Sequence, residues 1–296
     1  MKRATGETTA GQRYLALQRA AKQAGRPADE LIQLYALECF LDRLAQSRFA
    51  GRFILKGGVL LAALGARRPT RDIDFSTRAM SNEIAEVLRV AQEIAGMTLD
   101  DGVVFDSGAA TAEAIRENAD YSGVRVTLAG TLSRAVVSFH VDVNVGDPIW
   151  PEAQKITVPR LLDGVLVVPG YPLEMVLAEK IVTAIARGTT NTRWRDFVDV
   201  YTLVRHHEVG GDTLRKSMLL VAQYRNIELS VLSEVLIGYA DIAQQRWSAW
   251  LKKQRLDSTV PKEFSAVLHC VILFADPVIA GGLTAGTWNP VSQRWV

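Results

Sequence analysis

The chain has 296 residues, of which 48% are hydrophobic and 22% charged, a balance typical of a globular protein with a sizeable core. Its 34 basic and 32 acidic residues give a formal net charge of +2, which excludes a polybasic or polyacidic protein and leaves any nucleic-acid contact to local patches. The first residues lack the apolar core of a signal peptide, and no apolar run approaches the roughly 20 residues that span a bilayer. Cys39 and Cys270 lie in apolar helical contexts and are interpreted as buried thiols of a reducing compartment. We therefore expect a soluble cytoplasmic protein without a membrane partner.

Helices and short strands alternate along the first hundred residues. Apolar residues recur at helical spacing between Leu31 and Leu44, and Pro27 followed by two acidic residues suits a helix start. The apolar segment Phe53–Leu55 has the pattern of a short strand that a glycine pair ends. The patterns predict helices over residues 11–25, 28–47, 59–66 and 81–96, and strands over residues 53–55 and 71–76.

The pattern changes to β from about residue 103 to residue 145. GVRVTLAGTL and RAVVSFHVDVNVG are β-branched and alternating, which predicts two neighbouring antiparallel strands. Residues 146–170 are interpreted as a connector that ends in the strand VLVVP, and almost no strand pattern follows Tyr171. Helices are predicted over residues 172–188, 194–205, 212–225, 228–237, 239–254 and 262–275.

These patterns predict an α/β (α+β) fold, with a mixed sheet in the amino-terminal half and a helical carboxyl-terminal half. The expected domains are residues 1–170 and residues 171–296.

Three aspartates on predicted strands form the main candidate site. Asp72 and Asp74 stand two positions apart in RDIDF, so both side chains project from one face about 7 Å apart along the strand. Asp142 is a single carboxylate in the otherwise apolar strand SFHVDVNV. If the two strands are neighbours, the three carboxylates converge on an oxygen-rich site that suits Mg²⁺ or Mn²⁺ together with nucleotide phosphates. Each pattern alone also fits a solvated surface, and a structural or regulatory cation site is the alternative interpretation.

A glycine pair precedes the aspartates. Gly57 and Gly58 end one strand and begin a helix, where exposed backbone N–H groups can bind phosphate oxygens. The segment lacks the Gly-Lys-Ser/Thr ending of a P-loop. The combination of strand, glycine pair, helix, D-x-D strand and a later strand aspartate is more specific than any of its parts.

LKGGVLLAALGARRPTRDIDF resembles the first signature of the DNA polymerase beta-like nucleotidyltransferase superfamily, and VDVNVGD resembles its third-carboxylate strand. Within that superfamily the chain resembles the AbiEii-type nucleotidyltransferase toxins of type IV toxin–antitoxin systems, which include the MenT-like toxins. The resemblance also extends to LAEKIVTAIARGTTNTRWRDFVDVY, where the family carries a lysine followed by R-D-x-x-D. It covers about residues 53 to 203, and the later helices match only in general character.

The lysine segment has a plain interpretation and a family interpretation. By pattern alone Lys180 is a boundary residue of a helix, and Asp196 and Asp199 are first-turn carboxylates on one helix face. The resemblance implies instead that Lys180 binds the triphosphate and that Asp196 or Asp199 shapes the nucleotide or acceptor site. Spacing does not decide between the two aspartates.

The resemblance implies transfer of a nucleotide from an NTP to the 3′ end of tRNA, with a cognate antitoxin as a partner protein. Asp72, Asp74 and Asp142 would hold the metal ion, and Lys56, Gly57, Gly58 and Lys180 would bind the nucleotide. Local basic residues are candidates for RNA contact: Arg67, Arg68, Arg71, Arg193 and Arg195. The alternatives are a nucleotidyltransferase that modifies a small molecule or a protein, and a non-catalytic nucleotide-binding module.

Overall fold

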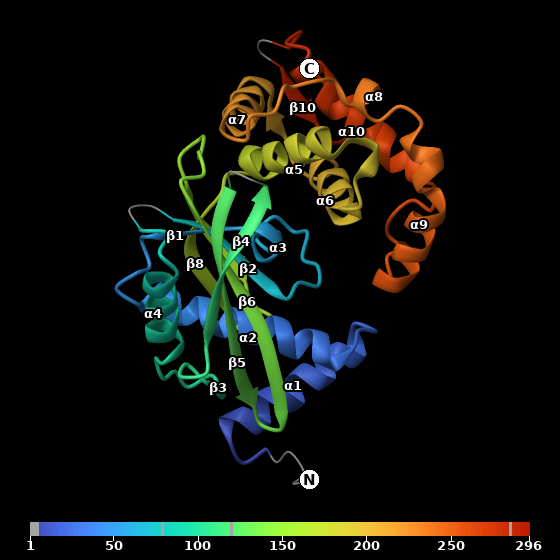
Figure 1. Cartoon of the computed structure of the whole chain (residues 1–296). Coiled ribbons are helices and arrows are strands. Elements are labelled where there is room, and N and C mark those ends of the chain that lie inside the picture. Colours follow the sequence, from blue (N-terminus) through green and yellow to red (C-terminus); the bar gives the residue numbers. More distant parts are fainter. Residues whose placement is uncertain (1–5, 78–79, 119–120, 284–285) are drawn as a thin grey trace. The chain divides into compact units, whose positions relative to one another are not determined.

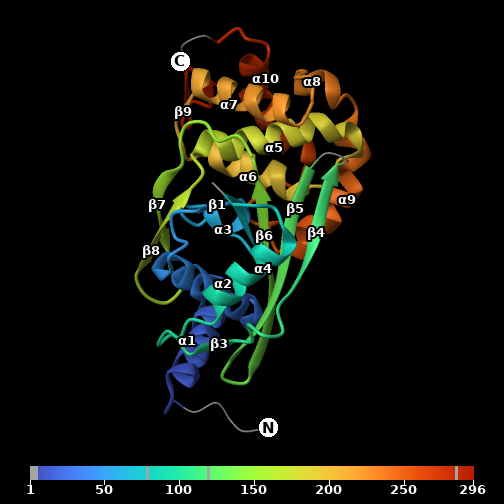
Figure 2. The same cartoon turned by 60° about the vertical axis from the view of Figure 1, so that its left-hand side comes forward.

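The computed structural model describes residues 6–77, 80–118, 121–283 and 286–296, and it separates into two units (Figures 1 and 2). Unit 1 contains the chain up to Asp147 together with Ala153–Tyr171. Unit 2 contains Pro148–Glu152 together with Pro172–Val296.

An eight-stranded mixed sheet forms the centre of unit 1 (Figure 1). Its order is β3-β5-β6-β2-β1-β8-β7, with β4 also paired to β5. The pairs β2–β6 and β1–β8 are parallel, and the others are antiparallel. The strands are β1 (Phe53–Lys56), β2 (Asp72–Thr77), β3 (Val103–Phe105), β4 (Thr111–Asn118), β5 (Tyr121–Leu132), β6 (Ala135–Val145), β7 (Gln154–Pro159) and β8 (Val165–Gly170).

Strict alternation along the central strands gives the sheet two different faces. On β6, the apolar side chains Val137, Phe139, Val141 and Val143 are buried, and the side chains between them are partly exposed. The buried face is covered by α2 and α4, and Phe139 packs edge-to-face against Phe40 of α2. The opposite face carries the aspartates of β2 and β6, and we call it the carboxylate face. The helices of unit 1 are α1 (Thr9–Gln23), α2 (Ala28–Gln46), α3 (Gly57–Leu60) and α4 (Ile84–Ala95).

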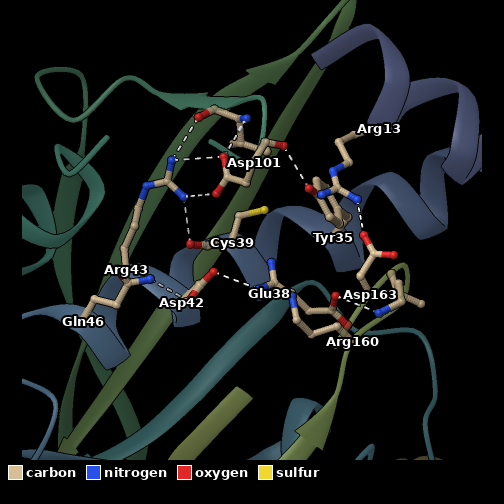
Figure 3. Close-up of polar contacts among 12 residues, drawn as sticks. Arg13, Tyr35, Glu38, Cys39, Asp42, Arg43, Gln46, Asp101, Arg160 and Asp163 are labelled. Carbon is tan, nitrogen blue, oxygen red and sulfur yellow. Dashed lines mark hydrogen bonds and ion pairs between the residues drawn. The ribbon is translucent and has the colours of Figure 1, made fainter. Parts of the chain in front are cut away.

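A buried polar network joins α2 to the loop before β3 (Figure 3). The guanidinium of Arg43, which is 1% exposed, donates to the carboxylate of Asp101 with Nη1 2.5 Å from Oδ2. It also donates to the backbone carbonyls of Cys39, Met97 and Val103. These bonds satisfy a charge that would otherwise be costly to bury.

Unit 2 is a bundle of helices with a small three-stranded sheet of order β11-β10-β9. Helix α5 packs against α6 and α7, and α10 packs against α6, α7, α8 and α9 (Figure 2). An aromatic cluster around Trp194, Phe197, Tyr239, Trp247 and Phe264 forms much of its core. The elements are α5 (Leu173–Arg187), the 3₁₀ helix η1 (Gly188–Thr190), α6 (Trp194–Val204), β9 (Val209–Gly210), α7 (Gly211–Tyr224), α8 (Leu232–Val235), α9 (Tyr239–Gln254), α10 (Phe264–Ile279), β10 (Thr287–Asn289) and β11 (Arg294–Trp295).

The mixed α/β fold predicted from the sequence is confirmed, including the antiparallel pair of β5 and β6. Three local predictions are wrong. The helix expected over residues 228–237 is only the single turn α8. Residues 154–159 form strand β7 where a connector was expected, and the helix expected over residues 59–66 is the single turn α3 followed by turns. Both cysteines are free and buried, as expected. Within the described residues, every helix is too short or too polar to cross a membrane.

Candidate active site

Four charged residues lie opposite one another on four adjacent strands of the carboxylate face. Strand pairing places Lys56 of β1 opposite Asp74 of β2, Asp74 opposite Asp142 of β6, and Asp142 opposite Arg125 of β5. Directly opposite residues share a face of a sheet and have neighbouring Cβ atoms. From β1 to β5 the charges are therefore positive, negative, negative, positive, and we call these four residues the charged row. The exposed Glu113 of β4 lies opposite Arg125 and follows the row with a negative charge.

The outer cations of the charged row are both ion-paired. Arg125 donates Nε and Nη2 to the two carboxylate oxygens of Asp142, at 2.8 and 2.6 Å. Lys56, which is 7% exposed, places its Nζ 2.6 Å from Oδ2 of Asp147, at the start of the loop that follows β6. Its ammonium also lies over the ring of Tyr171.

Asp72 lies two residues before Asp74 on β2, and its side chain is paired with a histidine. Its Oδ1 is 2.8 Å from Nδ1 of His140, which occupies the opposite position on β6. Both side chains are a little more than one-third exposed. The three predicted aspartates, Asp72, Asp74 and Asp142, thus lie on one face of two paired strands.

The environment of Asp74 opposes its ionised form. Burial, together with the nearby carboxylates of Asp142 and Asp72, raises the pKa of Asp74 to about 6, although the charges of Lys56 and Arg68 partly offset the effect. A carboxylate held at such a cost is one that a cation would stabilise.

The turn before α3 lies directly against Asp74. Gly57 has a φ of +66°, and a Cβ added there would come within 1.9 Å of Oδ2 of Asp74. A Cβ on Gly58 would meet Oγ1 of Thr70 at 2.9 Å and the guanidinium of Arg68 at 3.1 Å. Only glycine allows the backbone this approach. The role of the two amides in phosphate binding stays a prediction.

The chemistry of the three aspartates suits a divalent metal ion, but their carboxylates are not close enough together to form a complete metal-binding site. Three carboxylates on adjacent strand positions supply the oxygen ligands that Mg²⁺ and Mn²⁺ prefer. Across the described part of the chain, no three acidic, histidine or cysteine side chains lie close enough to hold one ion together. Pairing explains this, because Arg125 holds Asp142 and His140 holds Asp72.

A second cluster lies in unit 2, between α5 and α6. Nζ of Lys180 is 2.8 Å from Oδ1 of Asp196 and 2.7 Å from Oδ2 of Asp199, and all three side chains are almost buried. Arg193 adds a bond from Nε to Oδ2 of Asp196 at 2.6 Å. Burial alone would raise the pKa of Asp196, but the charges of Lys180 and Arg193 lower it below its ordinary value. Both aspartates of R-D-x-x-D therefore contact the lysine.

The predicted RNA-binding arginines differ in their surroundings. Arg71 and Arg195 are exposed, and Arg68 lies beside the glycine turn. Arg67 is paired with the buried carboxylate of Glu38, at 2.7 Å, and also donates to the carbonyl of Pro159. Arg193 is paired with Asp196 as described above.

Sequence reasoning missed Arg125, His140 and Asp147. The signal for two of them was present, because Arg125 and His140 are polar residues at alternate positions of apolar strands, like Asp142 itself. The strand register that brings them beside the aspartates depends on tertiary pairing.

The fold and the carboxylate face define a mixed α/β protein with three aspartates on one face of its central sheet. The sequence model of the family described as "Nucleotidyl transferase AbiEii toxin, Type IV TA system" matches residues 39–269. The chain therefore belongs to this family of nucleotidyltransferase toxins.

Two solved structures from Helicobacter pylori are similar to the chain at low identity. One is an H. pylori protein described as a nucleotidyltransferase, with a TM-score of 0.49 and 13% identity over 86% of this chain and 96% of that one. The other is JHP933 from Helicobacter pylori, with a TM-score of 0.48 and 15% identity over 83% of this chain and 91% of that one. These likenesses are too distant to carry an argument about function. A search of curated proteins found no match.

Proposed function

We propose that the protein transfers a nucleotide from an NTP to the 3′ end of tRNA, in the cytoplasm, and thereby blocks translation and arrests growth. The observation that carries this function is the register of β2 against β6, in which Asp74 lies opposite Asp142 and Asp72 lies on the same face. The elevated pKa of Asp74 and the glycine turn against its carboxylate add support.

In this reaction a bond forms between the acceptor hydroxyl oxygen and the α-phosphorus of the NTP, and the bond to pyrophosphate breaks. Asp72, Asp74 and Asp142 would hold Mg²⁺ or Mn²⁺, which supplies positive charge to the triphosphate and the leaving group. Asp142 would also accept the proton of the acceptor hydroxyl. The amides of Gly57 and Gly58 would donate to phosphate oxygens.

Basic residues support an RNA acceptor over a small molecule. Arg71, next to Asp72, is exposed, and Arg68 lies beside the glycine turn. Guanidinium groups near an acidic site offer contacts for the phosphates of a nucleic acid. Arg195 is the exposed candidate in unit 2.

Lys56 and Lys180, the two lysines proposed to bind the nucleotide, are both already ion-paired with aspartates. Lys56 would have to exchange Asp147 for a phosphate, and Lys180 would have to exchange Asp196 or Asp199. A lysine ammonium can exchange a carboxylate for a phosphate, because both are oxyanions that accept charge-assisted hydrogen bonds.

The function is tested by expressing the protein in bacteria and analysing tRNA from the arrested cells. Wild type is expected to arrest growth and to leave tRNA with added nucleotides at its 3′ end that can no longer be aminoacylated. Asp72→Asn is expected to do neither, and Asp257→Asn, which alters an exposed aspartate after α9, is expected to act like wild type. Growth arrest with unmodified tRNA would contradict the proposed acceptor.

A cognate antitoxin, expected from the type IV toxin–antitoxin family, should restore growth in this assay.

A further inference from the structure

Arg125 of β5 is the one member of the charged row that sequence reasoning and the family resemblance leave without a role. Its guanidinium makes two hydrogen bonds to one carboxylate, with Nε 2.8 Å from Oδ1 and Nη2 2.6 Å from Oδ2 of Asp142. Bidentate charge-assisted pairs of this geometry are strong and orientationally specific. Asp142 is also the carboxylate assigned above to the metal ion.

A guanidinium and a divalent cation compete for the same carboxylate. Both oxygens of Asp142 accept from Arg125, so a metal ion that approaches Asp142 meets a positive charge already in place. The side chain of Asp142 is 13% exposed, so solvent screens this competition only in part.

The guanidinium of Arg125 is exposed enough to break its pairing with Asp142 without becoming a buried, unpaired charge. The side chain of Arg125 is 33% exposed, against 9% for Lys56 at the other end of the charged row. An arginine at that exposure can rotate toward a new oxyanion at modest cost, whereas an unpaired buried cation could not. A triphosphate bound at the carboxylate face would provide such an oxyanion.

Resting on the proposed nucleotide transfer, we infer that Arg125 is an exchangeable counter-ion of the site, paired with Asp142 before the metal ion binds and with the nucleotide phosphates afterwards. It is a positioning residue in the first state, because it fixes the orientation of Asp142. In the second state it contributes to nucleotide affinity. Its charge thus couples metal binding to nucleotide binding, since the metal binds Asp142 weakly until a phosphate draws the guanidinium away.

The experiment measures Mn²⁺ binding to metal-stripped protein by the loss of the free Mn²⁺ EPR signal, without nucleotide and with a nonhydrolysable NTP analogue. Without nucleotide, Arg125→Gln is expected to bind Mn²⁺ about tenfold more tightly than wild type, because the competing charge is gone. With the analogue present, the gain should disappear and the analogue itself should bind more weakly. Arg125→Lys keeps the charge but loses the bidentate geometry, so both effects should be intermediate.

Two variants make the result specific. Arg89→Gln removes the same charge from an exposed arginine of α4, paired only loosely with Glu93 at 3.5 Å, and should leave Mn²⁺ affinity unchanged. Asp142→Asn should abolish the difference between Arg125→Gln and the parent chain.

An Arg125 that merely braces β5 against β6 would give a lower melting temperature in Arg125→Gln with unchanged or weaker Mn²⁺ binding, and that result overturns the inference. If wild type and Asp74→Asn bind Mn²⁺ equally well, the proposed metal site itself is wrong. If Asp74→Asn abolishes Mn²⁺ binding while Arg125→Gln matches wild type, only the role of Arg125 is wrong.

Discussion

At the scale of single residues, burying the ionised carboxylate of Asp74 beside other carboxylates lowers the stability of the folded protein. Asp74 is buried beside two other carboxylates, and its pKa is raised to about 6. An unfolded chain ionises the same group near pH 3.9. The folded protein therefore loses stability as the pH rises from about 4 through about 6, where the unfolded state has already released the proton.

We expect Asp74→Asn to stabilise the metal-free protein above pH 6, since the amide carries no charge to bury. The gain in the free energy of unfolding should be about 1–3 kcal/mol at pH 7.5 and should vanish near pH 4. Chemical denaturation with a chelator present, at several pH values, measures it. Asp257→Asn, at an exposed aspartate, is the control, and an Asp74→Asn protein that is less stable at every pH would contradict the interpretation.

The aspartates could be identified from the sequence because alternation in a strand is a local property. Asp142 stands out among valines, and Asp72 and Asp74 have the spacing of one strand face. The partners of these aspartates were not identified. His140 reaches Asp72 through the pairing of strands that lie far apart in the sequence, and Arg125, although on the neighbouring strand, meets Asp142 only in one particular register of β5 against β6. The same holds for Lys56, whose partner Asp147 lies 91 residues away.

At the scale of elements, the turn from β1 into α3 controls the position of Asp74. The backbone at Gly57 has a left-handed conformation and passes so close to Asp74 that no side chain fits. The element itself was predicted as a longer helix, and it ends after one turn, before the chain enters β2 beside β1.

We expect Gly57→Ala to displace Asp74, because its Cβ would lie 1.9 Å from the carboxylate oxygen at an unfavourable φ. Mn²⁺ binding should weaken at least tenfold, and the free energy of unfolding should fall by about 1–3 kcal/mol. Gly51→Ala is the matched control, since a Cβ there meets nothing within 4 Å. Unchanged Mn²⁺ affinity in Gly57→Ala would show that the turn does not position Asp74.

Helix α2 carries the other element-scale prediction. Arg43→Ala leaves the carboxylate of Asp101 buried without its guanidinium, and we expect a loss of about 3–5 kcal/mol in the free energy of unfolding. Arg48→Ala, two residues past the end of α2, removes an exposed arginine paired with Glu93 and should cost less than about 1 kcal/mol. Equal losses in urea denaturation would mean that burial does not set the value of these pairs.

At the scale of the whole molecule, a variant in either unit can lose activity because it loses a functional group or because it loses stability. The Lys180 cluster in unit 2 pairs two almost buried aspartates with Lys180, and Arg193 adds a second cation at Asp196. The sequence could identify this segment by resemblance, but burial of its carboxylates is a property of the packed helices. Loss of toxicity in a lysine variant therefore has two possible causes.

We expect Lys180→Ala to lose about 2–4 kcal/mol of stability, because it leaves Asp196 and Asp199 without their shared cation. Lys180→Ala combined with Asp199→Asn removes one positive and one negative charge and should recover part of that loss in thermal denaturation. If the combined variant is no more stable than Lys180→Ala, the cluster is not held by charge balance.

The central claim is that the aspartates of the carboxylate face catalyse nucleotide transfer to RNA. The direct measurement is transfer of label from each α-³²P NTP to total tRNA by purified protein with Mg²⁺, comparing wild type, Asp74→Asn, Asp142→Asn and the exposed control Asp257→Asn. We expect wild type and Asp257→Asn to label tRNA with at least one NTP, and the two site variants to be at least a hundredfold slower. No labelling by wild type with any NTP, or undiminished labelling by the two site variants, would contradict the claim.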